Sequence, residues 1–151
     1  MLGQGISKLQ YIEQMKREGL NLIILKNDKR LYQSTRAGML PLYQAISVFG
    51  ISQLKNTTIV DKIVGKAAAL LISYFQANTV YCSTLSVRGK TVLENHGITF
   101  RYEELAPEII NRYGTDICPF EKAVLDVEDP KMGYLRIQAK LQQLGLLDPV
   151  S

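Results

Sequence analysis

Apolar and polar positions alternate in short blocks that predict a mixed set of helices and strands. Residues 8–19 place apolar side chains at helical spacing and end on a glycine, which predicts an amphipathic first helix. Residues 21–26 and 30–34 flank an Asn-Asp pair, the pattern of a β-hairpin. A second helix is predicted over 40–49, with proline in its first turn and glycine after its end.

The middle of the chain predicts one long helix. Thr58 and Asp61 match the spacing of a capping box, and the apolar run after them extends the predicted helix over 59–76. The remaining blocks predict strands at 79–85 and 98–103 and helices at 87–97, 118–127 and 131–145.

This order of elements predicts a single α/β domain over residues 1–151. Strands separated by single helices favour parallel crossovers, so we expect a three-layer α/β/α fold with a mixed sheet of four or five strands. The second hairpin strand is expected to run against the others. The helix starts near Thr58, Leu85 and Cys118 should then meet at the carboxyl edge of the parallel strands, where open α/β sheets bind ligands.

Composition narrows the class of protein. The 151 residues carry a net charge of +4, with no apolar run approaching the roughly 20 residues that span a bilayer. The basic excess is mild, and no aromatic–basic motif accompanies it, which argues against nucleic acid as a partner. The start of the chain lacks the pattern of a signal peptide, and two cysteines make no disulfide framework. We therefore expect a cytoplasmic protein with reduced thiols and no membrane partner.

Two lysines are candidates for an anion site. In the predicted long helix, Lys62 and Lys66 would share one face, and Lys66 would stand in an otherwise apolar stretch beside Gly65. Lys66 could snorkel to solvent or could reach a ligand that bears an anionic or carbonyl group. Asp61 fits the structural role of a capping acid.

Cys118 is a second candidate, with two interpretations. It precedes a proline and stands three residues before Glu121, as the first residue of a capping box would, which is typical of a helix cap. A thiol at a helix start can also be a nucleophile, although a nearby carboxylate works against the thiolate. His96 fits a helix end, and Cys82 fits the core, so no metal site is expected.

Two segments of the chain carry a resemblance to a known family. The segments "DKIVGKAAALL" at 61–71 and "NRYGTDICPFEKAVLDVEDP" at 111–130 together resemble a bacterial family of unknown function, number 1893 in the domain-of-unknown-function series. The resemblance extends from about Ser7 to Leu146. It implies a cytidine-deaminase-like α/β/α fold and no established activity.

True zinc deaminases use a His-x-Glu at one helix start and a Pro-Cys-x-x-Cys at another. The corresponding segments here are "TIVDK" at 58–62 and "CPFE" at 118–121, which lack the histidine and the second cysteine. The comparison therefore implies neither zinc nor another cofactor.

The functional expectation is a metal-free protein that binds a small anionic or nucleotide-like ligand. The expected binding residues are Thr58, Asp61, Lys62, Lys66, Arg112, Gly114, Thr115, Asp116 and Glu121. The alternative is an enzyme, other than a zinc deaminase, whose catalytic group is Cys118 or Lys66. An interaction role, including a homodimer, also stays open.

Overall fold

The computed structural model describes the backbone of residues 2–111 and 113–147, and the side chains from Gln10 onward within these ranges. Its helices are α1 Leu2–Arg17, α2 Leu40–Leu54, α3 Lys66–Tyr74, α4 Val87–Asn95, α5 Pro119–Ala123 and α6 Pro130–Gln143. Its strands are β1 Leu22–Lys26, β2 Lys29–Ser34, β3 Thr58–Val64, β4 Thr79–Ser86 and β5 Thr99–Ala106.

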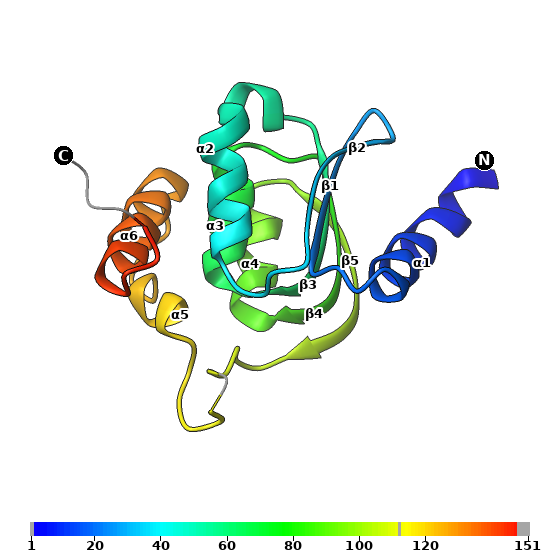
Figure 1. Ribbon diagram of the computed structural model, residues 1–151. Coiled ribbons are helices and arrows are strands. Elements are labelled where there is room, and N and C mark those ends of the chain that lie inside the picture. The colour runs from blue at the N-terminus through cyan, green and yellow to red at the C-terminus, as the bar shows by residue number, and fades with distance from the viewer. Residues whose placement is uncertain (1, 112, 148–151) are drawn as a thin grey trace.

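The five strands form one mixed sheet in the order β2-β1-β3-β4-β5. β3, β4 and β5 are parallel, and β1 is antiparallel to both of its neighbours. The prediction of a mixed α/β sheet is confirmed. The expected strand polarity was wrong, because the first hairpin strand, not the second, runs against the parallel set. β2 therefore ends at the same edge as β3, β4 and β5, which is the lower edge in Figure 1.

The layers are unequal. In Figure 1, α1 alone covers one face of the sheet, while α2, α3 and α4 cover the other, with α5 and α6 outside them. α3 is the centre of the core, because its residues from Lys66 to Ser73 are all buried. α6 packs directly on α3: a Cβ at Gly133 would come within 2.9 Å of Leu70. The expected three-layer α/β/α arrangement is confirmed.

The predicted long helix over 59–76 was wrong. Its first half is the central strand β3, and its second half is α3. Ile59 and Val60 are fully buried on opposite faces of the sheet, and β-branched residues of this kind suit a strand that is covered on both sides. Gly65 then takes an extended conformation (φ −100°, ψ −168°) and separates the strand from α3. Consequently Thr58 and Asp61 form no capping box.

The other predicted elements are present with shifted ends. The hairpin turn is confirmed, with Asn27 and Asp28 at φ 53° and 64°. α2 continues past Gly50, which is non-helical, and α5 ends earlier than expected. Within the ranges described, no helix has both the length and the apolar character needed to cross a membrane.

Candidate functional site

The start of α3 is bound by a carboxylate from a distant part of the chain. The Oε1 and Oε2 atoms of Glu121 accept hydrogen bonds from the backbone N–H groups of Lys66 (2.8 Å) and Ala67 (2.7 Å). Glu121 is only 3% exposed. A helix start attracts anions because its first N–H groups are unpaired and carry partial positive charge. The protein's own carboxylate therefore fills the anion position that the sequence predicted for an external ligand.

Two glycines make this contact possible. A Cβ at Gly65 would lie 2.5 Å from Glu121 Oε1, and one at Gly89 would lie 2.9 Å from the carbonyl carbon and oxygen of Gly65. The starts of α3, α4 and α5 therefore meet within van der Waals distance. Only residues without a side chain fit at these two positions.

α4 begins at the same edge and is capped locally. Ser86 Oγ accepts a hydrogen bond from the N–H of Gly89 at 2.9 Å, and Ser86 is buried. This is the usual N-cap arrangement, in which a side-chain oxygen binds the amide three residues later.

The side chain of Lys66 is buried, and its ammonium group has two hydrogen-bond partners. Its Nζ lies 3.0 Å from the carbonyl oxygen of Leu125 and 3.0 Å from Glu128 Oε2, and the residue is 5% exposed. The ammonium group therefore ties α3 to the segment between α5 and α6. It neither snorkels into solvent nor faces an open cleft.

Cys118 occupies the N-cap position of α5, as the sequence predicted, but its side chain makes no cap hydrogen bond; Pro119 follows it as the first helical residue. Burial raises the pKa of the Cys118 thiol; the N–H groups of Phe120 and Glu121 lower it by a smaller amount, and the Glu121 charge raises it further. These effects together disfavour the thiolate that a nucleophile would need. Glu121 does not complete a capping box at α5, because both of its oxygens bind α3.

A second carboxylate lies close to Glu121. Burial raises the pKa of Glu121, two backbone N–H groups oppose this, and the charge of Glu108 raises it again. Glu108 Oε1 is 3.2 Å from Arg88, while its Oε2 is buried without a partner among the described residues. Glu108 gave no signal in the sequence, because it lies in an irregular segment without a recognisable motif.

The loop before α5 is stabilised by its own side chains. Asn111 Oδ1 accepts from the N–H of Tyr113 and of Thr115, both at 3.1 Å, and Asp116 forms an ion pair with Lys122. The Asp116 pKa is lowered, first by the hydrogen bond from Lys122. Gly114 adopts φ 73°, a turn conformation that favours glycine. Of the predicted loop residues, Arg112 lies outside the described residues.

Thr58 and Asp61 lie apart from α3's start. Thr58 begins β3 and pairs with Thr79, so it lies at the opposite edge of the sheet. Asp61 lies midway along β3, between Leu22 of β1 and Cys82 of β4. Burial raises the pKa of Asp61 to about 7, and the N–H groups of Lys62 and Ile63 reduce the effect.

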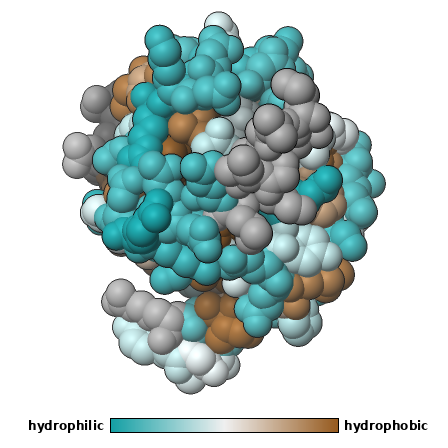
Figure 2. Space-filling view, turned by 90° about the vertical axis from the view of Figure 1, so that its right-hand side faces the viewer, coloured by the Kyte–Doolittle hydropathy of each residue, from teal (hydrophilic) through white to brown (hydrophobic). Residues whose placement is uncertain are grey.

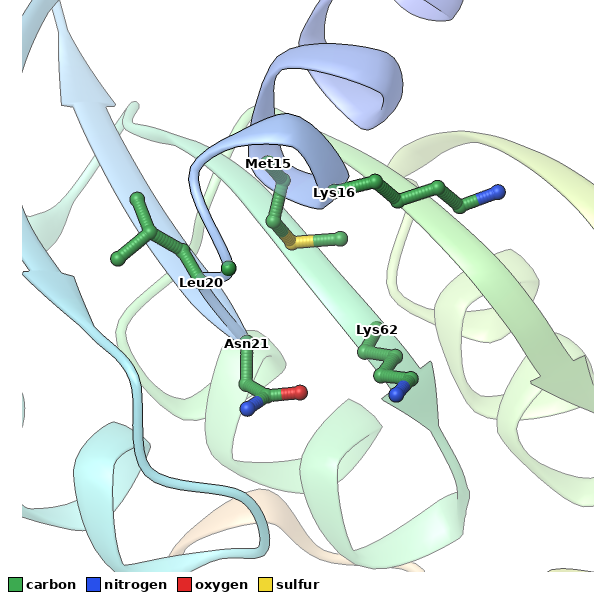
Figure 3. Close-up of a pocket in the computed structure, with 6 residues that line it drawn as sticks. Met15, Lys16, Leu20, Asn21 and Lys62 are labelled. Atoms are coloured by element: carbon green, nitrogen blue, oxygen red, sulfur yellow. The ribbon is translucent and has the colours of Figure 1, made fainter.

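Lys62 lines a cavity on the α1 side of the carboxyl edge. The cavity measures about 210 Å³, and its lining residues are Met15, Lys16, Gly19, Leu20, Asn21 and Lys62. Figure 3 shows the Lys62 ammonium beside the Asn21 amide, whereas Lys16 extends away from both. Lys16 Nζ binds Glu103 at 2.8 Å. Figure 2 shows that the face around α1 is mainly hydrophilic, with apolar areas toward its lower part.

The structure thus separates the predicted site residues. Glu121 of α5 binds the backbone of Lys66 where α3 begins, and Cys118 stands at the start of α5. Asp61 lies midway along β3, and Gly114, Thr115 and Asp116 lie in the loop before α5. Lys62 lies at the same edge on the α1 side, and Thr58 lies at the far edge. Met15, Lys16 and Asn21 were not predicted, because the contact between the end of α1 and β3 depends on tertiary structure. Among the described residues, no group of three or more His, Cys, Asp or Glu side chains is arranged to hold a metal ion.

Comparison of the sequence with models of known protein families shows the family of this chain. Residues 10–141 match the family model described as "TM1506: Domain of unknown function (DUF1893)". The chain therefore belongs to the DUF1893 family.

A solved structure has the same fold. The crystal structure of a DUF1893 family protein (TM1506) from Thermotoga maritima at 2.70 Å resolution superposes with a TM-score of 0.79. The two chains are 24% identical over 87% of this chain and 88% of that chain, a level that supports the fold alone. None of the curated proteins compared with this chain matches it.

Proposed function

We propose that this protein binds a small organic anion, a carboxylate or a phosphate monoester, in the cavity between α1 and β3. The observation that carries the proposal is the Lys62 ammonium, which lines the cavity and has no hydrogen-bond or ion-pair partner among the described residues. No acidic residue lines the cavity with it. The start of α3 is a weaker candidate, because Glu121 already occupies its free amides.

The cavity offers complementary groups around Lys62. Lys16 lines it too, but its ammonium group extends away from Lys62 and pairs with Glu103, so Lys16 adds positive charge at a distance and no second direct contact. Asn21 donates its amide N–H to the carbonyl of Thr35 at 2.7 Å, which leaves its Oδ1 available to a hydroxyl or ammonium donor on the ligand. Met15 and Leu20 supply apolar contact.

The end of α1 does not oppose an anion strongly. Carbonyl groups at a helix C-terminus carry partial negative charge. Here the N–H of Gly19 binds the carbonyl of Lys16 (3.1 Å), and the N–H of Leu20 binds that of Met15 (3.0 Å). This is the Schellman pattern, with Gly19 at φ 67°, and it pairs two of these carbonyls.

The experiment is a titration of the full chain with inorganic phosphate and with citrate, followed by backbone amide NMR. We expect saturable shifts at Gly19, Asn21 and Lys62. Lys62→Ala should weaken binding at least about tenfold, since a charge-assisted hydrogen bond contributes about 1.5–3 kcal/mol. Lys131→Ala is the matched control, because Lys131 is an exposed lysine on α6, away from the cavity.

Equal affinity in the Lys62 and Lys131 variants would refute the proposal, and so would shifts centred on Lys66 and Ala67. A preference between phosphate and citrate would distinguish the two kinds of anion. From the family resemblance we also propose that the fold is cytidine-deaminase-like. This part of the proposal concerns the fold and not the activity. Zinc-dependent deamination is not proposed, because the chain lacks the residues that would hold zinc.

A further inference from the structure

A second cavity lies at the opposite edge of the sheet. It measures about 330 Å³ and lies where α3 and α4 end and β4 begins. Its lining includes the side chains of Asn56, Ser73, Gln76, Asn78 and His96. It shares no lining residue with the α1–β3 cavity.

The lining of this second cavity is polar, and it is rich in side-chain amides. Three of its side chains are carboxamides, which donate and accept hydrogen bonds, and no Lys, Arg, Asp or Glu lines it. α3 and α4 end here in the same hydrogen-bond pattern as α1, so it is the absence of Lys and Arg from the lining that argues against an anion. The lining contains no Phe, Tyr or Trp on which an aromatic ring could stack.

Ser73 places an unpaired hydroxyl beside this cavity. The residue is 6% exposed, and its Oγ is buried without a hydrogen-bond partner in the described part of the chain. Leaving such a hydroxyl unpaired is unfavourable. Because the Oγ atom is itself shielded from solvent, a ligand hydroxyl pairs with it only if the lining rearranges when the ligand enters.

His96 adds an acceptor. Its Nδ1 lies 2.9 Å from the carbonyl oxygen of Val92. Because a carbonyl only accepts, Nδ1 must carry the proton, and in the neutral ring Nε2 is then an acceptor.

Two lining residues are held in an unfavourable backbone conformation. Asn56 and Gln76 adopt φ 63° and 58°, and the N–H of Asn56 binds the carbonyl of Gln76 at 3.0 Å. Left-handed conformations are unfavourable for most non-glycine residues, and less so for asparagine than for glutamine. Glycine would be less strained at both positions, but it has no side-chain carboxamide to place in the cavity.

We propose that this cavity binds a small neutral polyol, such as a monosaccharide. Each hydroxyl of a polyol both donates and accepts, which matches carboxamides, a serine hydroxyl and a neutral imidazole. Ala77 and Ile98 in the lining suit the C–H surface of such a molecule. The inference is independent of the anion proposal, because the two cavities lie at opposite edges of the sheet.

The test is a titration of the full chain with D-ribose and D-glucose at neutral pH, followed by amide NMR and calorimetry. We expect saturable shifts at Ser73, Gln76 and Asn78 with at least one of the two sugars. Gln76→Gly removes a carboxamide and relieves the left-handed strain, so the variant should fold and should bind at least about fivefold more weakly. Ser73→Ala, which removes the unpaired hydroxyl, should weaken binding by a similar factor.

Lys62→Ala is the matched control, and it should leave sugar binding unchanged while it weakens phosphate binding at the other cavity. The proposal is overturned if neither sugar produces saturable shifts at these amides. It is also overturned if Gln76→Gly and Ser73→Ala bind as the unmodified chain does, or if phosphate binds here more tightly than either sugar.

Discussion

Helices α3 and α4 begin at the same edge of the sheet, and each has nine residues. They differ in the way their first turns are capped. The cap of α4 is Ser86, which binds an amide three residues later. The cap of α3 is Glu121, which lies 55 residues from Lys66 along the chain.

This difference has consequences for both folding and binding. A local cap forms with its own helix, whereas the cap of α3 forms only after the segment around α5 has docked. α3 is also the buried centre of the molecule, and a charged carboxylate stabilises its first turn. α4 is more exposed, and the hydroxyl of its own cap residue stabilises its first turn. Because the cap is internal, this helix start is not an open anion site.

Removing the distant cap should have the largest effect. Glu121→Ala leaves the amides of Lys66 and Ala67 buried and unpaired, so the free energy of unfolding should fall by about 3–5 kcal/mol. Urea unfolding followed by circular dichroism measures it. Glu94→Ala, which removes an exposed glutamate of α4, should change stability by less than about 0.5 kcal/mol. A loss below about 1 kcal/mol for Glu121→Ala would show that the contact contributes little.

Asp61 extends the comparison to a half-buried carboxyl group that has no helix start to bind. Its pKa is raised from 3.8 to about 7, so the folded protein holds this proton more tightly than the unfolded chain. Stability should therefore fall as pH rises from about 4 to about 7, by about 4 kcal/mol at most. Asp61→Asn should remove most of this slope and should be more stable than the unmodified chain at pH 8.

Thermal unfolding between pH 5 and pH 8 checks this prediction. The raised pKa of Glu121 adds a change of the same sign, so some slope should remain in Asp61→Asn. Identical pH profiles for Asp61→Asn and the unmodified chain would argue that Asp61 is ionised at little cost in the folded protein.

Gly65→Ala should reveal how closely Glu121 approaches α3. The three atoms nearest to the added Cβ would all belong to Glu121, at 2.5–2.8 Å, so the substitution should cost about 2 kcal/mol in the unmodified chain and much less in Glu121→Ala. Gly89→Ala is the matched control, because the atoms nearest to its Cβ would belong to Gly65 and Ser86 and not to Glu121. Its cost should persist in the Glu121→Ala background; equal costs for Gly65→Ala in both backgrounds would contradict the prediction.

The local cap should give the smallest effect. Ser86→Ala should lower the free energy of unfolding by about 1 kcal/mol, the usual contribution of an N-cap hydroxyl. Urea unfolding alongside Glu121→Ala gives the direct comparison. A loss for Ser86→Ala as large as that for Glu121→Ala would remove the distinction between the two helix starts.

The sequence by itself determined the elements whose signals are local. The Asn27–Asp28 turn and the helix start at Cys118 and Pro119 both depend on neighbours within a few residues. For the same reason β4 and β5 could be predicted from their β-branched and aromatic runs. The mixed α/β class followed from their order.

Only the tertiary structure decided that residues 58–64 are a strand, that Glu121 caps α3, and that Lys62 lines a cavity. Ile59 and Val60 are apolar neighbours that suit a helix or a strand, and burial on both faces of a sheet selected the strand. Glu121 has the spacing of a local cap at α5. Its carboxylate instead binds the otherwise unpaired backbone amides at the start of α3, 55 residues away along the chain. Spacing along the chain indicates which hydrogen bonds a side chain can form with its neighbours. Tertiary packing determines which distant groups come close enough to replace those neighbours as partners.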